Sequence, residues 1–362
     1  MKSVTEFSGG EAKKMVEILL DDVVVGNDYP VYVIGEVGHN HMGSVEECKK
    51  LFRMAQLAGA NAVKLQKRDN ATLYIKSFFN SAYNSENAYG PTYGTHRQAL
   101  EFTFGQYQEL QEEAARLDLT FFATPFDLPS VDFLEKLNVP FYKIASAGIQ
   151  NPLLLRAVGS IGKPVLVATG GAGVEQIRRA VDALQGCPIV LMHCVAAYPA
   201  KAEKMNIRRV VAIKNSFPEC VTGFSDHEHG FVTSHMAVAF GASVFEKHIT
   251  LDHTAKGTDH PFSQEFAGFS QYIKNLNRAK AALEIYQQPM EEENAPTKKM
   301  GYSVYPSRDI PAGTVIESYH LVIKSPLDGL PGWTYDELLG RKTTRFLLTE
   351  EPLDWSDFEA EY

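Results

Sequence analysis

Short apolar runs alternate with stretches of helical period along residues 31–285. The runs are rich in β-branched residues, and each is followed by a polar turn. Strands that alternate with helices are typical of right-handed β-α-β units and a parallel sheet. Eight such units over about 250 residues predict a (β/α)8 TIM barrel. The runs are Val31–Gly35, Ala62–Gln66, Thr120–Thr124, Phe141–Ser146, Pro164–Thr169, Ile189–Cys194, Val221–Ser225 and Val244–His248.

An open, doubly wound sheet is the alternative to the barrel. No G-x-G-x-x-G motif follows the first run, which disfavours a dinucleotide-binding sheet. The helical period is clear after the first run, where Cys48, Leu51, Phe52, Ala55 and Ala58 share one face. Ser44 and Glu47 predict a capping box before these residues, and Gly59 is placed to end the helix.

Two segments interrupt this rhythm. Residues 68–103, rich in Asn and Tyr, follow the second run and are long enough to be a lid, a binding loop or disordered. Residues 289–297 are polar and carry two prolines, as linkers often do. We therefore expect a barrel domain at 1–290, a linker at 291–298 and a small β-rich domain at 299–362.

Composition limits the classes of partner and the compartment. The net charge of −9 argues against nucleic acid as the main partner, because binding a phosphate backbone needs a basic surface. No run of 18 apolar residues occurs and the first residues lack a signal-peptide pattern, so no membrane partner is expected. The four cysteines form no C-x-x-C pair and are interpreted as reduced thiols of a cytoplasmic protein.

Functional residues of a (β/α)8 barrel gather at the C-terminal ends of its strands. Nearly every predicted strand ends in a polar or ionisable group, which packing alone does not require. These groups are Glu36, Lys64, Gln66, Thr124, Lys143, Ser146, Thr169, His193, Ser225, Asp226, His227, Glu246, Lys247 and His248. Because the strands are parallel, we expect most of these side chains to meet at one mouth.

Lys64 and Lys143 end different strands and predict an anion site for phosphate or carboxylate. Schiff-base formation, as in class I aldolases, is an open alternative for a lysine here. His227 and His248 end neighbouring strands and can bind one divalent ion while leaving positions for substrate and water. Glu36 is a candidate general acid or base, or an ion-pair partner of Lys64.

The same residues carry a family resemblance. The segments occur in family order over residues 31–265, and the tail adds 307–313 and 338–342. They are Ile34–Ser44, Gly59–Gln66, Phe122–Phe126, Tyr142–Ser146, His193–Pro199, Gly223–His227, Glu246–Leu251 and Gly257–His260. The chain resembles the N-acetylneuraminate (sialic acid) synthase family, with its C-terminal antifreeze-like SAF domain. Residues 93–102 look closer to the animal-type synthases.

The resemblance implies a reaction in which phosphoenolpyruvate condenses with N-acetylmannosamine or a related aldose, possibly 6-phosphorylated, and phosphate is released. It implies that phosphoenolpyruvate is held by Lys64, Thr124, Lys143, Ser146 and Ser225. It also implies that the sugar is contacted by Glu36, Gln66, Tyr198 and Asp259, with Glu246 a further substrate-binding group. His227 and His248 would bind Mn²⁺, or Mg²⁺ or Co²⁺, and a domain-swapped homodimer is expected.

Three departures from the family pattern concern the sugar more than the reaction. Ala147 and Gly148 follow Ser146, Val195 and Ala196 replace a polar pair, and Ser325 stands where the SAF domain commonly has an arginine. Synthases for Kdn, legionaminic or pseudaminic acid are therefore alternatives. A barrel that only binds carbohydrate is a further alternative.

Overall fold

The computed structural model describes residues 16–284 and 290–359. The chain forms two compact units, 1–283 and 284–362. The division falls before the boundary expected at residue 290. None of the helices within residues 16–284 and 290–359 combines the length and the hydropathy that a membrane span requires.

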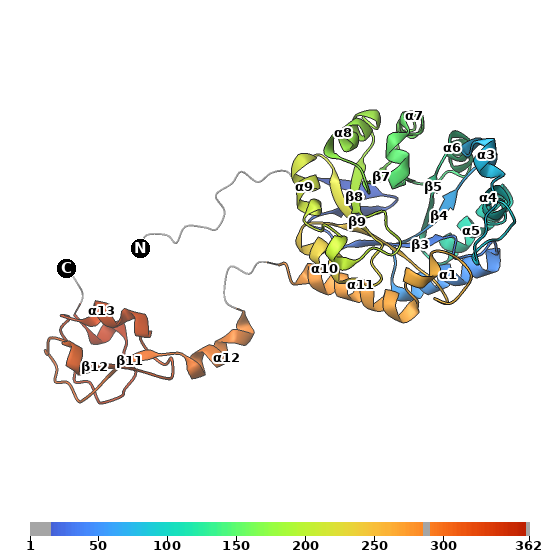
Figure 1. Cartoon of the computed structure of the whole chain (residues 1–362). Helices are drawn as coiled ribbons and strands as arrows, with labels where there is room; N and C mark the ends of the chain where they lie inside the picture. Colours follow the sequence, from blue (N-terminus) through green and yellow to red (C-terminus); the bar gives the residue numbers. More distant parts are fainter. Residues whose placement is uncertain (1–15, 285–289, 360–362) are drawn as a thin grey trace. The chain divides into compact units, whose positions relative to one another are not determined.

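Eight parallel strands form the first unit's sheet, whose order is β5-β4-β3-β10-β9-β8-β7-β6 (Figure 1). The terminal strands β5 and β6 also pack against each other, so the sheet is a nearly closed barrel. All eight predicted runs are confirmed, and the open-sheet alternative is wrong. The strands are β3 (Tyr32–Gly38), β4 (Ala62–Lys67), β5 (Thr120–Pro125), β6 (Tyr142–Ile144), β7 (Val165–Ala168), β8 (Ile189–Cys194), β9 (Val221–Asp226) and β10 (Val244–His248).

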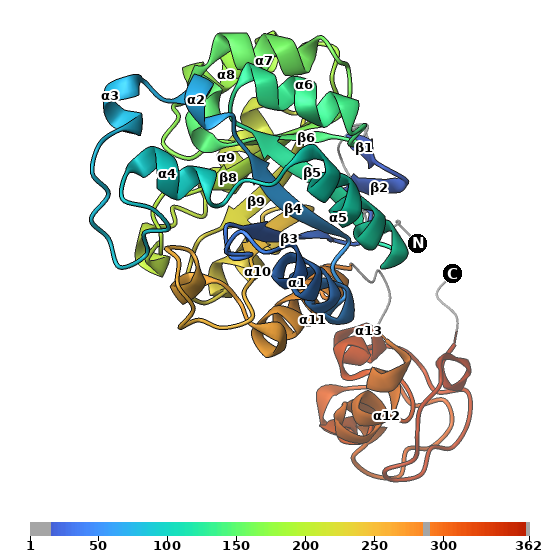
Figure 2. The ribbon, with the colours of Figure 1, turned by 90° about the vertical axis from the view of Figure 1, so that its right-hand side faces the viewer.

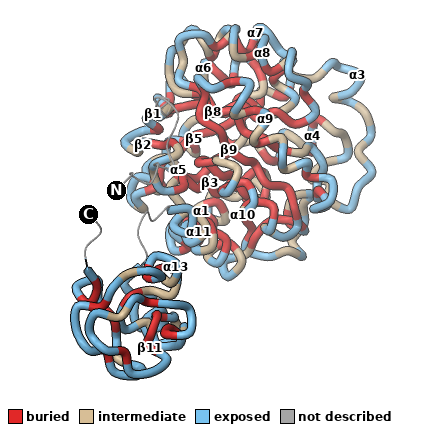
Figure 3. The backbone as a smooth tube through the Cα atoms, turned by 90° about the vertical axis from the view of Figure 1, so that its left-hand side faces the viewer, coloured by how far each residue is buried: buried red, intermediate tan, exposed pale blue. Residues whose placement is uncertain are grey.

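Helices cover the outside of the barrel, and buried and exposed residues alternate along them, whereas the strands are almost wholly buried (Figure 3). They are α1 (Val45–Ala58), α5 (Phe104–Arg116), α6 (Leu128–Lys136), α7 (Pro152–Gly159), α8 (Val174–Ala183), α9 (Arg209–Ser216), α10 (Val232–Ala239) and α11 (Phe266–Ala281). Ser44 caps α1, and Gly59 ends it at a φ of 92°. Only half of the expected capping box forms, because the Glu47 carboxylate binds Lys50 instead.

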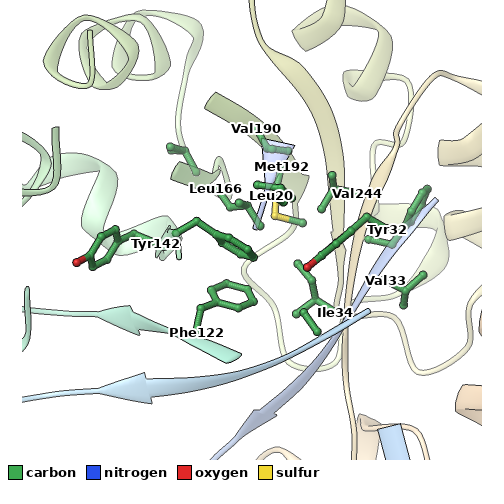
Figure 4. Close-up of a cluster of buried hydrophobic side chains, with 14 of the residues drawn as sticks. Leu20, Tyr32, Val33, Ile34, Phe122, Tyr142, Leu166, Val190, Met192 and Val244 are labelled. Carbon is green, nitrogen blue, oxygen red and sulfur yellow. The ribbon is translucent and has the colours of Figure 1, made fainter. Parts of the chain in front are cut away.

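An antiparallel hairpin, β1 (Glu17–Leu20) and β2 (Val23–Gly26), precedes the barrel and was not expected from the sequence. Its Leu20 and Val25 are fully buried in the barrel core. Figure 4 shows Leu20 among Leu166, Val190 and Met192. The hairpin therefore supplies apolar side chains to the N-terminal end of the barrel.

The long segment 68–103 is ordered. It contains α2 (Asn70–Leu73), α3 (Lys76–Phe79) and α4 (Tyr93–Gln98), which lie across the barrel from β1 and β2 (Figure 2). Tyr74, Phe78, Tyr83 and Tyr93 pack ring against ring within it. We call residues 68–103 the lid segment.

The second unit has its own small core, made by Val304, Ile310, Ile316, Leu321, Leu330, Leu338, Leu347, Leu353 and Phe358. Its regular strands, β11 (Ser303–Pro306) and β12 (Leu321–Lys324), are antiparallel, and isolated bridges join the loops. The short helix α13 (Tyr335–Leu338) completes it.

The segment expected to be a linker, 291–298, instead lies within helix α12 (Glu291–Met300). Three glutamates in the first turn and two lysines in the last turn favour the helix through its macrodipole. Residue 289, the first of the polar segment 289–297, lies outside the described residues.

Candidate functional site

On several strands the inward-facing positions change from apolar to polar toward the C-terminal end of the strand. On β10 the alternate residues Val244, Glu246 and His248 run in this order, and on β5 Phe122 is followed by Thr124. Side chains two residues apart lie on the same face of a strand. The N-terminal half of the barrel interior is therefore a hydrophobic core, and the C-terminal half carries the chemistry.

All twelve residues predicted for the site line a single cavity of about 510 Å³ at the C-terminal ends of the strands. They are Glu36, Lys64, Gln66, Thr124, Lys143, Ser146, Tyr198, Ser225, His227, Glu246, His248 and Asp259. They come from six of the eight strands and from the loops that follow β6, β8, β9 and β10.

Two buried lysines and two buried glutamates form the floor of the cavity. The Lys64 Nζ lies 2.7 Å from Glu36 Oε2 and donates to Thr124 Oγ1 at 2.9 Å. The Lys143 Nζ donates to both carboxylate oxygens of Glu246. The Lys64 Nζ is also 3.8 Å from Glu246 Oε2, so the four charges form one network.

The electrostatics of the network favour the ionised form of the Glu246 carboxylate. Burial raises the pKa of Glu246, but the attraction of Lys143 and Lys64 outweighs burial and holds this pKa well below its usual range. Burial lowers the pKa of Lys143, and the charge of Glu246 opposes that shift. The Ser225 hydroxyl donates to Glu246 Oε1 at 3.1 Å and adds to the stabilisation of the carboxylate.

The Glu36 carboxylate also joins the floor to the lid segment. The Gln66 Nε2 donates to Glu36 Oε1 at 2.7 Å, and Gln66 Oε1 accepts from Arg68 at 2.6 Å. Elsewhere on the wall, Ser146 Oγ lies 3.1 Å from Cys194 Sγ and accepts from the backbone N–H of Gly170.

His227 and His248 lie side by side, with ring centroids 5.6 Å apart. The His227 Nδ1 is 2.8 Å from the carbonyl oxygen of Val195, so Nδ1 carries the proton of the neutral ring and Nε2 keeps a lone pair. Burial, followed by the charge of His248, lowers the pKa of His227 to about 3. Tyr198 packs on the His227 ring at 4.4 Å, and Asp259 Oδ2 lies 3.8 Å from His248 Nδ1.

The residues of this pair suit a divalent ion with open positions more than a closed structural site. The buried His248 Nδ1 has no hydrogen-bond partner. Within residues 16–284 and 290–359, no cluster of three or more His, Cys, Asp or Glu side chains is placed to hold a metal. A metal here would therefore take its remaining ligands from water or substrate.

Four strand-end groups lie away from the cavity. Thr169 and His193 bond to backbone carbonyls, of Met192 and Met205. Asp226 and Lys247 point outward and form a buried ion pair at 3.1 Å. Alternation along a strand accounts for this last pair, because each neighbours an inward-facing residue.

Sequence reasoning missed three cationic or imidazole side chains on the cavity wall, His39, Arg68 and Arg97. Arg68 lies two residues beyond Gln66 and continues the inward face of β4. This spacing of two could have placed Arg68 at the site. His39 lies inside a segment that carried the resemblance. Arg97, on α4, lies in the stretch 93–102 that also carried a resemblance, but only the fold of the lid segment brings it to the mouth of the barrel.

The chain is similar to proteins of known class. It is 33% identical over 322 residues to the N-acetylneuraminate-9-phosphate synthase of Homo sapiens, covering 88% of this chain and 90% of the relative. It is 29% identical over 346 residues to a pseudaminic acid synthase of Campylobacter jejuni, covering 92% and 99%. The crystal structure of an N-acetylneuraminic acid synthetase from Leptospira borgpetersenii, in complex with citrate, superposes with a TM-score of 0.67 at 31% identity, covering 78% and 95%.

The family profiles agree with these similarities over both units of the chain. The NeuB family profile matches residues 51–288, and the SAF domain profile matches residues 302–359. The chain therefore belongs to the NeuB family and ends in a SAF domain.

Proposed function

We propose that the protein is a nonulosonic acid synthase. It condenses phosphoenolpyruvate with N-acetylmannosamine or a related aldose and releases inorganic phosphate. The observation that carries this proposal is the network of Lys64, Lys143, Glu36 and Glu246 on the floor of the cavity. The relatives named for N-acetylneuraminate 9-phosphate and for pseudaminic acid support the product class.

Phosphoenolpyruvate binds at the lysine floor in this proposal. Its phosphate and carboxylate take hydrogen bonds from the Lys64 and Lys143 ammonium groups and from the hydroxyls of Thr124, Ser146 and Ser225. Each lysine already faces an acceptor at 2.7 to 2.9 Å, so both groups are oriented before the substrate arrives. Preoriented donors in a closed cavity stabilise phosphate charge more than they do in water.

The acceptor sugar lies above this floor, against Glu36, Gln66, Tyr198 and Asp259. The methylene carbon of phosphoenolpyruvate forms the new bond to the aldehyde carbon, whose oxygen takes up a proton. Water then adds to the former enol carbon. The bond from that carbon to the phosphate oxygen breaks, so the carbon becomes a ketone and phosphate leaves. Glu36 lies between Lys64 and Gln66 and is placed to move a proton at the sugar.

His227 and His248 hold a divalent ion, Mn²⁺ in preference to Mg²⁺ or Co²⁺, in this proposal. The His227 Nε2 lone pair supports that role, as does the buried His248 Nδ1, which has no hydrogen-bond partner. When bound, such an ion supplies Lewis-acid activation of the aldehyde.

The test is phosphate release from phosphoenolpyruvate, with Mn²⁺ and with chelator. Four acceptors are compared: N-acetylmannosamine, mannose and the 6-phosphate of each. We expect sugar-dependent, chelator-sensitive release, and its loss in Lys143→Met. The Lys163→Met variant, changed on the outer surface, is the matched control and keeps its activity. Release that needs no sugar, or that survives in Lys143→Met, contradicts the proposal.

We also propose that the chain is a homodimer in solution, as the resemblance implies. The SAF unit supports this with an exposed apolar group, Tyr302, Ile323 and Trp333, of which Trp333 is 76% exposed. Sedimentation should give twice the chain mass of 40.2 kDa. The chain mass at micromolar concentration would contradict the dimer.

A further inference from the structure

The guanidinium groups of two arginines on the cavity wall have no carboxylate partner among the described residues. Arg68 is 6% exposed, and its guanidinium contacts His39 Nε2 at 3.0 Å and Gln66 Oε1 at 2.6 Å. Arg97 is half-buried and contacts His39 Nδ1 at 3.1 Å and the Tyr93 hydroxyl at 3.1 Å. Among the described residues, no Asp or Glu forms an ion pair with either arginine. A buried charge without a counter-charge is costly, so this place favours an anion.

The imidazole between the arginines cannot satisfy both of them. Partial burial and the charges of Arg68 and Arg97 lower the pKa of His39 well below its usual range, so the ring is neutral. A neutral imidazole has one acceptor nitrogen and one N–H, whereas a guanidinium only donates. Therefore, in either the Arg68 contact or the Arg97 contact, a guanidinium N–H faces the N–H of the imidazole. An anion at this place would accept from the arginines and relieve the conflict.

The carboxylates of the cavity are already engaged elsewhere. Glu36 and Glu246 face the two lysines, and Asp259 contacts His248 and Thr258. Outside the cavity, Glu101 Oε2 accepts from the backbone N–H of Arg68 at 3.3 Å, but its ion pair is with Lys67 Nζ, at 2.7 Å. The lysine floor is thus balanced within the protein, whereas the arginine end carries excess positive charge.

The two ends are joined by a continuous line of contacts. From Lys64 it runs through Glu36 and Gln66 to Arg68. From Arg68 it continues through His39 to Arg97. Because the lysines and the arginines line the same cavity, a sugar whose aldehyde meets phosphoenolpyruvate at the floor can place its far end at the arginines.

We propose that Arg68, Arg97 and His39 form a second anion subsite, which binds a phosphate group at the end of the acceptor sugar farthest from its aldehyde. The substrate class is then a terminally phosphorylated aldose. This inference rests on the proposed function for the identity of the acceptor. The phosphate takes charge-assisted hydrogen bonds from both guanidinium groups. His39 supplies an N–H toward it once one arginine turns to the anion.

The test separates the subsite from the reaction by using probes that cannot react. N-acetylmannosaminitol and its 6-phosphate lack the aldehyde, and their binding is measured calorimetrically with phosphoenolpyruvate present. Each charge-assisted hydrogen bond is worth roughly a tenfold change in affinity or more, so we expect the phosphate to tighten binding about 100-fold. Arg97→Gln should reduce this preference at least tenfold, whereas Arg97→Lys should keep most of it.

The matched control is Arg179→Gln, the same change on an exposed arginine of α8, and it should keep the full preference. Thermal melting of each variant checks the fold. Equal binding of the two alditols, or a preference unchanged in Arg97→Gln, overturns the subsite even if condensation is observed. A phosphate preference that depends on Arg97 supports the subsite even if no acceptor condenses, and in that case only the proposed reaction fails.

Discussion

Lys143 and Glu246 form a buried bidentate ion pair. The Lys143 ammonium group donates to both carboxylate oxygens of Glu246, at 2.8 and 2.7 Å. The two residues are about a hundred positions apart in the chain, on β6 and β10. Since these strands are not hydrogen-bonded neighbours, the pair spans the barrel interior and fixes the positions of both side chains.

The first prediction concerns stability. Glu246→Leu leaves Lys143 without its counter-charge in a buried site and should lower the free energy of unfolding by about 3–5 kcal/mol. Urea unfolding followed by a signal from the barrel measures the loss. Glu175→Leu, which breaks an exposed pair on α8, should cost at most about 1 kcal/mol. Equal losses in the two variants would contradict the role of the network.

A second prediction follows for covalent chemistry. The Glu246 carboxylate stabilises the ammonium form of Lys143, whereas Schiff-base formation needs the free amine. Treatment with pyruvate and borohydride should therefore leave no adduct on Lys143, as measured by mass spectrometry of the peptide. A stoichiometric reduced adduct would favour the aldolase alternative.

The histidine pair gives a third prediction. His248→Ala should abolish Mn²⁺-dependent turnover and weaken Mn²⁺ binding in calorimetry, because one of two imidazole ligands is lost. His253→Ala, on the loop after β10, is the control and should retain both. If His248→Ala binds Mn²⁺ as the unaltered protein does, the metal belongs elsewhere.

The lid segment is fastened to the loop after β10 by two hydrogen bonds. The Tyr89 hydroxyl donates to Lys256 O at 2.6 Å, and Asn87 Oδ1 accepts from the Gly257 N–H at 2.9 Å. Tyr89→Phe should speed amide hydrogen exchange in residues 80–97 roughly 2- to 10-fold, the effect of one lost hydrogen bond. Tyr83→Phe, at a hydroxyl with no such bond, is the matched comparison, and an equal acceleration there would argue against the fastening.

The final prediction concerns acid stability. Burial lowers the pKa of His41 to about 3, so the folded state holds the ring neutral while the unfolded state takes up a proton below about pH 6.5. The contribution is complete above pH 6.5 and falls by roughly 1.4 kcal/mol per pH unit as pH drops toward 3. His41→Gln should remove that part of the dependence of the unfolding free energy on pH. At pH 8, where the ring is neutral in both states, the difference in unfolding free energy between the two proteins gives the packing cost alone. A slope unchanged in the variant would show that His41 is not the titrating group.

The barrel and most of the cavity residues can be predicted from the pattern of apolar and polar positions along the chain. Parallel strands have a period of two and are buried on both faces, so the apolar runs and their polar ends located Lys64, Lys143, Glu246 and His248 directly. The remaining features depend on contacts between residues that are far apart in the chain. Leu20 of the hairpin is buried in the core because it fills the N-terminal end of the barrel. No local sequence pattern predicts that position. Arg97 joined Arg68 because the lid segment folds back through contacts between residues far apart in the chain, and local periodicity carries no information about such contacts.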